Sequence, residues 1–481
     1  MQENKPMHVH FMGIGGSGCA SLAMLAFQQG YKVSGCDTAK DSYYIDELKK
    51  LGIDIAVGHD KSHITEDVDL VCCTPALFDI DPNNPELQEA KQRGILMTWQ
   101  EFMGKYLQKD KRVITISGTH GKTTTTFLAG EMLIEGGVDP TVEGGSTYIK
   151  WKNGGRYGHS DVFLCEADEF NRNFYSYSPE IAVINNLEMD HQEYYRDFDD
   201  MLSAFSDFLL NGGKLKVLVM NGDSQGCIDL LKLVYDKPQM KDVRVILYTR
   251  DKELTLNFPA AFEKAVWCIT SKDETGTGFD LYKDGVIHHF HTNQFGEYNA
   301  ANCICGILPA WELKVTDDAI NEAIDHFQGA GRRFDLVGYY HGAGIYDDYA
   351  HHPTAIKAVL TMAKEYFPTH KVMALLEPHQ ISRFLHMFDD FVDALNVADD
   401  VVIGKCYVGR EKNKGLTPIS KEQWEAASPK FSVYEDEEEM IREVERRIDE
   451  EGDDIIVNMG LGRSFLWSRV FVEDDKKGKA E

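Results

Sequence analysis

A lysine between two glycines and a run of threonines is the first group in this sequence that could do chemistry. The stretch VITISGTHGKTTTTF, residues 113–127, places Gly118, Gly121, Lys122 and Thr123 directly after an apolar run. A glycine turn between a strand and a helix exposes backbone N–H groups, and the helix dipole adds positive potential, so the pattern favours a bound phosphate. Lys122 would supply a point charge for the outer phosphates, and Thr123 a hydroxyl for Mg²⁺.

This loop departs from the common phosphate-binding loop at one position. The usual eight-residue form begins with glycine, and Ile116 stands there. A glycine turn beside a solvated lysine is the alternative interpretation. The apolar run before the loop and the threonines after it favour the phosphate site.

A second glycine loop lies near the start of the chain. In HFMGIGGSGCA, residues 10–20, Gly13, Gly15 and Gly18 follow a predicted strand, and Asp37 ends the next one. This is the dinucleotide fingerprint, with its acidic residue. The pyrophosphate of any nucleotide satisfies the same geometry, so a nicotinamide cofactor and a nucleotide sugar both remain open.

Two polar groups follow two later apolar runs. They are Glu166, Asp168 and Glu169 in CEADE, and Glu188, Asp190 and His191 in EMDHQ. In a parallel sheet the carboxyl ends of the strands meet at one edge, where ligands bind. We therefore expect both groups beside the phosphate loop, where carboxylates bind a metal ion that bridges ATP oxygens. Taken singly, each residue is also interpretable as a loop carboxylate or helix cap.

Two polar islands stand at predicted helix starts. GEYNAAN contains Asn299 and Asn302, whose alternative role is to cap a helix. DDYAHHP contains Asp348, His351 and His352, and the histidines would otherwise pack under their own loop.

The elements that must position these residues alternate between short apolar runs and helical patterns, which is typical of βαβ units. We predict strands at 7–12, 31–37 and 113–117, helices at 19–30, 123–135 and 384–398, and a hairpin-like segment at 333–353. The predicted fold class is α/β in three domains: a Rossmann-like domain at 1–110, a central P-loop ATPase-like domain at 111–329 and a Rossmann-like domain at 330–481. Glycines at 329–331 suggest a hinge.

Composition narrows the function further. The net charge of −28 argues against a nucleic-acid partner, whose affinity rests on basic patches. No apolar run approaches the roughly 20 residues of a membrane helix, and no signal peptide begins the sequence, so we expect a cytoplasmic protein without membrane insertion. The ten cysteines are scattered, most of them in apolar runs, and form no CxxC pair, which argues against a structural zinc site.

In this order and along essentially the full length, a set of motifs resembles the Mur ligases, the ATP-dependent amide ligases of bacterial cell-wall synthesis. The motifs are GTHGKTTTT, EADE followed by NNLEMDH, GEYNAAN, GAGRRFD, DDYAHHPTAI and EPHQISRFLHMFDDF. The histidine in GTHGKTT and the opening GIGGSG are similar to the branch that joins L-alanine to UDP-N-acetylmuramate.

The resemblance implies that the first loop holds the uridine diphosphate of UDP-N-acetylmuramate rather than NAD, and that the second holds ATP with Mg²⁺. A substrate carboxylate would attack the γ-phosphate, and the amino group of L-alanine would then displace phosphate from the acyl phosphate. Phosphoryl transfer of this kind depends on positioning and charge neutralisation. The expected oligomeric state is a monomer or a weak homodimer.

Individual roles follow from the same resemblance. Gly118, Thr119, His120, Gly121, Lys122, Thr123, Thr124, Asn299, Arg332, Asp348 and His351 would bind ATP; Thr123, Glu166 and His191 would hold metal; Gly15, Gly16, Ser17, Asp37, His379 and Arg383 would bind substrate; Lys122, Glu166, His191 and Arg383 would be catalytic.

The sequence departs from the alanine-adding branch at Phe170 and Asn171, where a small residue and an acid are usual, and at Gln380, where we expect arginine. The related ligase that attaches a recycled tripeptide to the same nucleotide sugar is therefore an alternative, although Arg383 favours the alanine branch. An NAD-dependent dehydrogenase and a P-loop switch protein that only hydrolyses nucleotide are alternatives from other classes.

Overall fold

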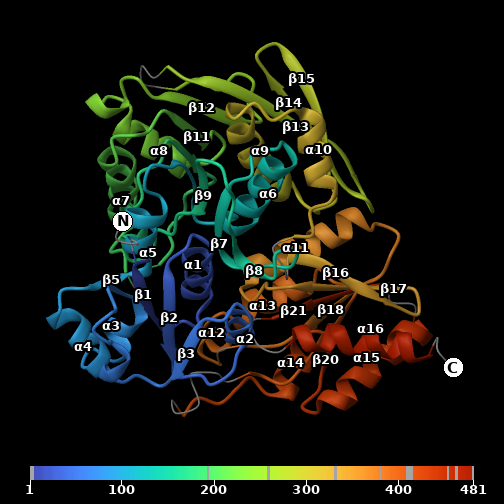
Figure 1. Ribbon diagram of the computed structural model, residues 1–481. Coiled ribbons are helices and arrows are strands. Elements are labelled where there is room, and N and C mark those ends of the chain that lie inside the picture. Colours follow the sequence, from blue (N-terminus) through green and yellow to red (C-terminus); the bar gives the residue numbers. More distant parts are fainter. Residues whose placement is uncertain are drawn as a thin grey trace. The chain divides into compact units, whose positions relative to one another are not determined.

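The structure is a computed structural model with α/β architecture (Figure 1). It describes residues 5–191, 194–256, 261–329, 333–379, 381–407, 415–451, 454–460 and 464–478. The chain forms two compact units: Met1–Thr270 with Gly278–Asn293 and Glu297–Ala330, and Ser271–Thr277 with Gln294–Gly296 and Gly331–Glu481. The domain boundaries expected at 110 and 329 remain a prediction, and residues 330 and 331 of the expected hinge lie outside the described residues.

The first unit begins with a five-stranded parallel sheet of order β3-β2-β1-β4-β5. The strands are β1 (His8–Met12), β2 (Lys32–Asp37), β3 (Asp54–Val57), β4 (Leu70–Cys73) and β5 (Leu96–Thr98). Helix α1 (Ser17–Gln28) covers one face, because Val9, Phe11 and Leu22 belong to one buried apolar cluster. The strands predicted at 7–12 and 31–37 and the helix predicted at 19–30 are confirmed, as is the Rossmann-like arrangement.

The opposite face of this sheet is covered by shorter elements. Helix α4 (Pro85–Gln92) packs Leu87 against Met12, Cys36 and Cys73. The 3-10 helix η1 (Lys61–His63) lies beside α4. Alternation along β1 explains the split, since Met12 points to this face and Phe11 to the other.

A ten-stranded sheet of order β15-β14-β13-β12-β11-β10-β6-β9-β7-β8 forms the rest of the unit. The strands are β6 (Arg112–Ser117), β7 (Thr141–Tyr148), β8 (Asn153–Arg156), β9 (Val162–Glu166), β10 (Ile181–Ile184), β11 (Val217–Asn221), β12 (Arg244–Thr249), β13 (Glu263–Asp273), β14 (Gly276–Lys283) and β15 (Val286–Thr292). β6 runs parallel to both β9 and β10, so their carboxyl ends share one edge.

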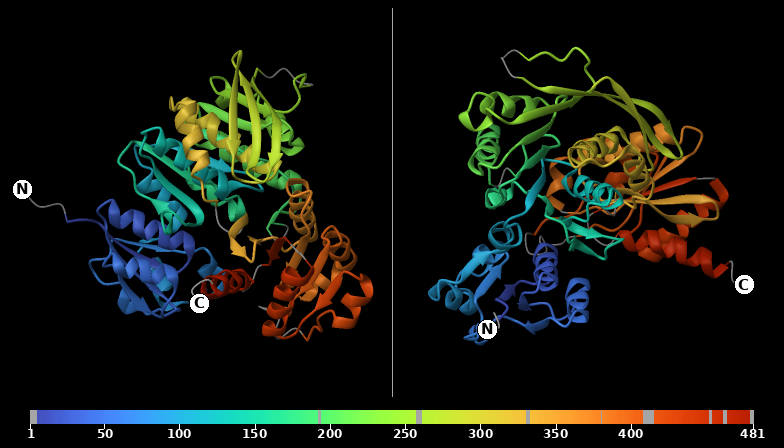
Figure 2. Two further views of the ribbon diagram at one scale, coloured as in Figure 1. Left: turned by 90° about the vertical axis from the view of Figure 1, so that its right-hand side faces the viewer. Right: turned by 45° about the horizontal axis from the view of Figure 1, so that its top comes forward.

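Helices α6 (Lys122–Glu135) and α9 (Glu297–Glu312) lie side by side against this sheet (Figures 1 and 2). The helix expected at 123–135 and the strand expected at 113–117 are thus confirmed. The other helices of the unit are α2 (Tyr43–Lys50), α3 (Ala76–Ile80), α5 (Trp99–Phe102), α7 (Phe198–Asn211), α8 (Gln225–Val234) and α10 (Asp317–Asp325), with the short turns η2 (Met103–Leu107), η3 (Phe170–Ser176) and η4 (Pro238–Met240).

The second unit contains a six-stranded sheet of order β16-β17-β21-β18-β19-β20, antiparallel only between β16 and β17. Its strands are β16 (Arg333–Tyr340), β17 (Ala343–Asp348), β18 (Val372–Leu376), β19 (Asp400–Ile403), β20 (Phe431–Val433) and β21 (Ile455–Met459). Its helices are α11 (Pro353–Tyr366), α12 (Ile381–His386), α13 (Phe388–Leu395), α14 (Lys421–Ala427), α15 (Glu437–Glu451) and α16 (Phe465–Gly478). The expected hairpin within 333–353 is confirmed as β16 and β17.

The single helix expected at 384–398 is wrong. The segment contains the end of α12 and the whole of α13, with Met387 between them in a non-helical conformation. The rings of Phe384 and Phe391 stack with centroids 3.9 Å apart. In one straight helix residues seven apart are separated by about 10 Å along the axis, so this buried stack requires the break.

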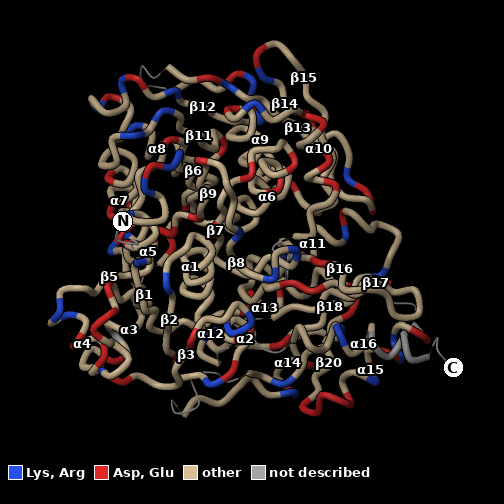
Figure 3. The backbone as a smooth tube through the Cα atoms, viewed as in Figure 1, with Lys and Arg blue, Asp and Glu red and all other residues tan. Residues whose placement is uncertain are grey.

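Acidic and basic residues are interspersed in both units, with the acidic ones in excess (Figure 3). Among the described residues, no helix is long and apolar enough to cross a membrane. Eight of the ten cysteines are buried, and Cys268 and Cys406 are the two that are not.

Candidate active site

The glycine loop between β6 and α6 requires glycine at two positions. Gly118 has φ of 130° and Gly121 has φ of 82°, both in the region that favours glycine. A Cβ on Gly118 would stand 2.7 Å from the carbonyl oxygen of Asn186, and one on Gly121 would stand 2.3 Å from Asn302 Oδ1. The loop therefore packs closely against Asn186 and Asn302. Helix α6 begins immediately after the loop, so the N–H groups of its first turn are directed at the loop.

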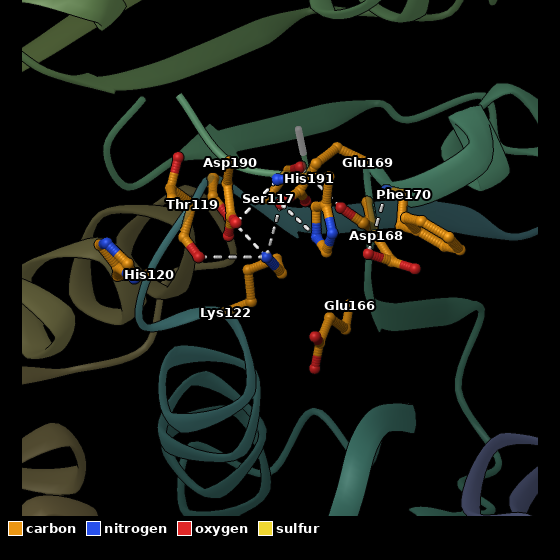
Figure 4. A network of polar contacts seen from close by, with 12 residues as sticks. Ser117, Thr119, His120, Lys122, Glu166, Asp168, Glu169, Phe170, Asp190 and His191 are labelled. Carbon is orange, nitrogen blue, oxygen red and sulfur yellow. Dashed lines mark hydrogen bonds and ion pairs between the residues drawn. The ribbon is translucent and has the colours of Figure 1, made fainter. Parts of the chain in front are cut away.

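The amino group of Lys122 forms hydrogen bonds with its own loop. It donates to the carbonyl oxygens of Gly118 at 2.7 Å and Thr119 at 3.3 Å, and pairs with Glu169 Oε1 at 3.0 Å. Figure 4 shows the amino group directed at this side of the loop. Burial lowers the pKa of Lys122, but the carboxylates of Glu169 and Glu166 more than offset it, so the pKa lies above its usual value. The lysine is a fixed cation.

Thr123 and Glu166 form a second contact at the same edge. The Thr123 hydroxyl donates to Glu166 Oε2 at 2.8 Å, and the backbone N–H of Gly145 on β7 donates to the same oxygen at 2.9 Å. Glu166 is the last residue of β9, the strand next to β6. The parallel register thus places this carboxylate at the first turn of α6, as the sequence predicted.

Buried carboxylates gather around Lys122 in excess of its single charge. Burial raises the pKa of Glu166 and of Glu169, although Lys122 opposes it in both. Burial, with the charges of Glu166 and Asp168, also raises the pKa of Glu143 on β7. A site that holds this many acidic groups out of water calls for a further cation.

Asp168, Glu169 and His191 offer ligand atoms within 4.8 Å of one another. His191 Nε2 lies 3.8 Å from Glu169 Oε1, and its ring contacts that of Phe170 with centroids 5.0 Å apart (Figure 4). His191 has φ of 53°, an unusual backbone for a residue that is not glycine. The aromatic that departs from the alanine branch therefore packs on the predicted metal ligand.

These donors fit Mg²⁺. Carboxylate and hydroxyl oxygens are its preferred ligands. Glu169 is 1% exposed and its Oε2 makes no hydrogen bond. The ligands predicted from sequence were Thr123, Glu166 and His191; the structure groups His191 instead with Asp168 and Glu169, and pairs Thr123 with Glu166.

The remaining loop residues contact the strand end after β10. Thr119 Oγ1 accepts from the backbone N–H of Glu188 at 2.9 Å, and the backbone N–H of His120 donates to Asn186 Oδ1 at 2.8 Å. The His120 ring is exposed, 3.9 Å from Glu188 Oε2. Thr124 lies buried in the first turn of α6.

Helix α9 contributes two asparagines, both buried. Asn302 Oδ1 accepts from Thr125 Oγ1 at 3.3 Å, and Asn302 Nδ2 donates to Asn299 Oδ1 at 3.2 Å. The helix-capping alternative is wrong for Asn302, because it lies within α9 and contacts α6. No binding role was predicted for Asn302, and its spacing of three from Asn299 is the one sequence signal that could have indicated it.

The first glycine loop is built around Asp37. Its carboxylate accepts from the backbone N–H of Gly15 at 2.9 Å and from that of Ala39 at 2.9 Å. Gly16 precedes α1 and Ser17 begins it. The Ser17 hydroxyl donates to the carbonyl oxygen of Gly145 at 3.4 Å. Because Gly145 also donates to Glu166, one strand residue joins the two phosphate-type loops, which no sequence motif indicated.

In the second unit, Asp348 ends β17 and anchors its loop. Its carboxylate accepts from the backbone N–H groups of Phe334 at 2.8 Å and Ala350 at 2.7 Å. Arg332 and Gln380 lie outside the described residues. Three further residues predicted for the site in this unit form a separate group.

That group is His351, His379 and Arg383. Arg383 Nη1 donates to the carbonyl oxygen of His351 at 3.4 Å, and the His379 ring stacks on Tyr407 at 5.3 Å. Burial lowers the pKa of His351, with Arg383 and His379 acting in the same direction. The structure brings these three together, whereas the resemblance placed His351 at the nucleotide and His379 and Arg383 at the substrate.

Comparison with known proteins agrees with this geometry. Three family models match the chain: the Mur ligase family catalytic domain at residues 8–111, the Mur ligase middle domain at 116–310 and the Mur ligase glutamate ligase domain at 332–462.

Two curated relatives extend over most of the chain. The chain is 35% identical over 416 residues to a UDP-N-acetylmuramate–L-alanine ligase of Lachnoclostridium phytofermentans, covering 85% of this chain and 86% of that one. It is 32% identical over 466 residues to the enzyme of that name from Aquifex aeolicus, covering 97% of each.

Solved structures show the same fold. A UDP-N-acetylmuramate–alanine ligase from Thermotoga maritima superposes with a TM-score of 0.74 at 24% identity, covering 98% of this chain and 100% of that one. A murein peptide ligase from Psychrobacter arcticus superposes with a TM-score of 0.60 at 22% identity, covering 98% of each. By its relatives, its family models and its three-domain α/β fold, this chain belongs to the Mur ligase family.

Proposed function

We propose that the protein is an ATP-dependent ligase that joins L-alanine to the lactyl carboxylate of UDP-N-acetylmuramate in peptidoglycan precursor synthesis. The observation that carries this proposal is the likeness to alanine-adding relatives over 97% of the chain. The cluster of Lys122, Glu166 and the buried Glu169 beside a helix N-terminus supports it, since phosphoryl transfer needs such a site.

ATP and Mg²⁺ are the proposed cofactors. Bound Mg²⁺ would neutralise phosphate oxygens, and Thr123, Glu166 and the group of Asp168, Glu169 and His191 would hold it. The glycine loop would bind phosphate oxygens through its backbone N–H groups. Asn299 would lie toward the nucleoside, and His120 would contact the nucleotide from its exposed position.

Lys122 has a positional role in this scheme. Its amino group donates to two loop carbonyl oxygens and to Glu169. An arriving phosphate offers stronger, charged acceptors within the same reach. The lysine would then align the γ-phosphate for attack by the substrate carboxylate. It would reach the phosphate without any rearrangement of α6.

The first loop is proposed to bind the uridine nucleotide rather than NAD. Asp37 already accepts two backbone N–H groups, so it holds the loop open for a pyrophosphate. The link through Ser17 and Gly145 connects this loop to Glu166. A nucleotide sugar bound there would extend toward the phosphoryl-transfer site, which a redox cofactor has no reason to do.

The second unit is proposed to supply Arg332, Asp348 and His351 to the ATP site, and His379 and Arg383 to the substrate. Domains at 1–110, 111–329 and 330–481, a monomer or weak homodimer and a cytoplasmic location complete the proposal.

Product analysis tests the function. Purified protein with ATP, Mg²⁺, UDP-N-acetylmuramate and L-alanine should release phosphate and ADP and yield a product heavier by one alanine residue. Omitting either substrate should stop phosphate release, which excludes a nucleotide-hydrolysing switch. Product with the murein tripeptide and none with L-alanine would replace the proposal by the tripeptide-adding alternative. Micromolar NADH binding without uridine-nucleotide binding would favour the dehydrogenase alternative instead.

A further inference from the structure

A second cluster of metal-binding side chains lies in the N-terminal sheet, away from the ATP loop. His10, Cys36, His63 and Glu86 offer ligand atoms that all lie within 4.8 Å of one another. They come from four separate elements, β1, β2, η1 and α4. The cluster occupies the face of the sheet opposite α1, next to Met12 and Leu87.

The distances centre on the buried carboxylate of Glu86. His10 Nε2 lies 2.9 Å from Oε1, and His63 Nδ1 lies 3.3 Å from the same oxygen. Cys36 Sγ lies 3.1 Å from Oε2, and His59 Nδ1 lies 3.2 Å from Oε2 and 3.1 Å from Cys36 Sγ. Edges of a tetrahedral zinc site with nitrogen ligands are about 3.3 Å long, so these separations suit one shared ion.

The donors are enclosed but incompletely paired. His10 is 2% exposed and Glu86 is fully buried. His10 Nε2, His63 Nδ1 and Glu86 Oε1 make no hydrogen bond with the geometry that one requires, although they approach closely. Unpaired buried polar atoms are rare in proteins, and here they converge on one another.

A chain of hydrogen bonds fixes which His10 nitrogen carries a proton. The pKa of Asp67 is lowered, mainly by Lys32, so its carboxylate is an acceptor, and His8 Nδ1 at 3.0 Å must donate to it. A neutral His8 that donates through Nδ1 accepts from Ser34 at its Nε2, 2.8 Å away.

Ser34 has one proton and gives it to His8. His10 Nδ1, 2.8 Å from Ser34 Oγ, must then be the donor of their contact. A neutral His10 consequently directs the lone pair of Nε2 at the Glu86 carboxylate. Two lone pairs facing each other at 2.9 Å repel unless a cation lies between them. Metal-ligating histidines characteristically have their second nitrogen fixed in this way.

We propose that His10, Cys36, His63 and Glu86 form a site for a divalent transition metal, zinc being the ion that best suits two nitrogens, a thiolate and a carboxylate. His59 stands beside the thiol and the carboxylate as a neighbouring donor. Binding would displace the thiol proton of Cys36, because the thiolate is the form that ligates a metal.

A bound ion would stabilise the first glycine loop, which is proposed to bind the uridine nucleotide. The carbonyl oxygen of Cys36 accepts from the backbone N–H groups of Gly13 at 2.9 Å and Ile14 at 3.2 Å, and Asp37 follows directly. An ion that joins β2 to β1, η1 and α4 would hold this strand end under the loop. The role is structural, since no described group of the cluster belongs to the ATP site.

Cobalt spectroscopy tests the proposal without relying on activity. Protein freed of metal by chelation is titrated with Co²⁺ in excess Mg²⁺, which occupies the carboxylates of the ATP site. We expect one equivalent of Co²⁺ to bind with a thiolate-to-cobalt charge-transfer band, and Zn²⁺ to displace it stoichiometrically. Absence of that band in the folded wild-type protein overturns the proposal and leaves a protonated His10 paired with Glu86.

Variants identify the ligands. Cys36→Ser should remove the charge-transfer band, and His63→Ala should keep the band but weaken Co²⁺ binding at least about tenfold. Cys73→Ser is the matched control, because Cys73 is buried on the same face but outside the cluster. An unchanged band in Cys36→Ser, or its loss in Cys73→Ser, contradicts the assignment; circular dichroism verifies that each variant folds.

Discussion

Lys122 and Glu169 form an almost fully enclosed ion pair, with Nζ 3.0 Å from Oε1 and the glutamate 1% exposed. The pair joins the phosphate loop to the strand end after β9. Glu169 also lies within 3.8 Å of His191. The lysine of the phosphate loop and the predicted metal ligand are therefore connected through one carboxylate, so a change at any of the three affects the charge balance of the others.

Replacing the lysine should remove ADP formation. In Lys122→Ala the loop loses its cation and Glu169 loses its partner, so we expect turnover to fall by two or more orders of magnitude, about the effect of losing one transition-state charge contact. Coupled ADP release measures this, with circular dichroism to verify the fold. Lys357→Ala, at an exposed lysine on α11, is the control. Wild-type turnover in folded Lys122→Ala would exclude the loop as the ATP site.

Glu166→Gln should raise the Mg²⁺ concentration that gives half-maximal activity. Glutamine can still accept from Thr123 and Gly145 through one oxygen, as Glu166 Oε2 does, so the change removes charge with little change of shape. We expect turnover at saturating Mg²⁺ to fall by about two orders of magnitude. Glu188→Gln, at an exposed carboxylate near the same edge, should change neither value. Equal Mg²⁺ dependence in both variants would refute the role of Glu166.

Much of the fold could be predicted because its signals are local. The strand before Gly118 and the helix after Lys122 were readable from an apolar run, a glycine turn and a polar helix start. The break at Met387 was not, because it depends on the stacking of Phe384 on Phe391. A hydrophobic pattern does not show that two residues on separate helices will stack on each other.

The candidate site, like the fold, could be predicted only in part. Motifs indicated Lys122 and Glu166, and the parallel sheet then placed them together. Sequence could not indicate Gly145, whose backbone bridges Ser17 and Glu166. The absence of CxxC likewise excluded only zinc ligands that are close in sequence, whereas the cluster around Cys36 draws on four elements.

Stabilisation by Mg²⁺ should grow with pH. Burial raises the pKa of Glu143, Glu166 and Glu169, so over the range above the ordinary glutamate pKa the folded chain retains protons that the unfolded chain has released. The free energy of unfolding of the metal-free protein therefore falls as pH rises through this range. Mg²⁺ binds the ionised carboxylates, and should recover more stability at about pH 8 than at about pH 5.

Thermal unfolding with and without Mg²⁺ at the two pH values measures this difference. Glu143→Gln should reduce the pH-dependent loss in the metal-free protein, because it removes one of the buried acids. An Mg²⁺-induced shift of the melting temperature that is the same at both pH values would contradict the prediction.

Arg383→Ala should raise the KM for L-alanine by about 10- to 100-fold with a smaller change in kcat, which is the range expected for one hydrogen bond to a charged group. Arg383 is half-buried on α12 and donates to the carbonyl oxygen of His351 at 3.4 Å. Its planar guanidinium has the geometry that pairs with a small carboxylate. Initial rates at varied L-alanine and saturating UDP-N-acetylmuramate measure the effect. Arg442→Ala, at an exposed arginine on α15 whose Nη1 lies 3.6 Å from Glu438, is the control. If the KM for UDP-N-acetylmuramate rises instead while that for L-alanine stays constant, Arg383 binds the nucleotide sugar and the amino-acid assignment fails.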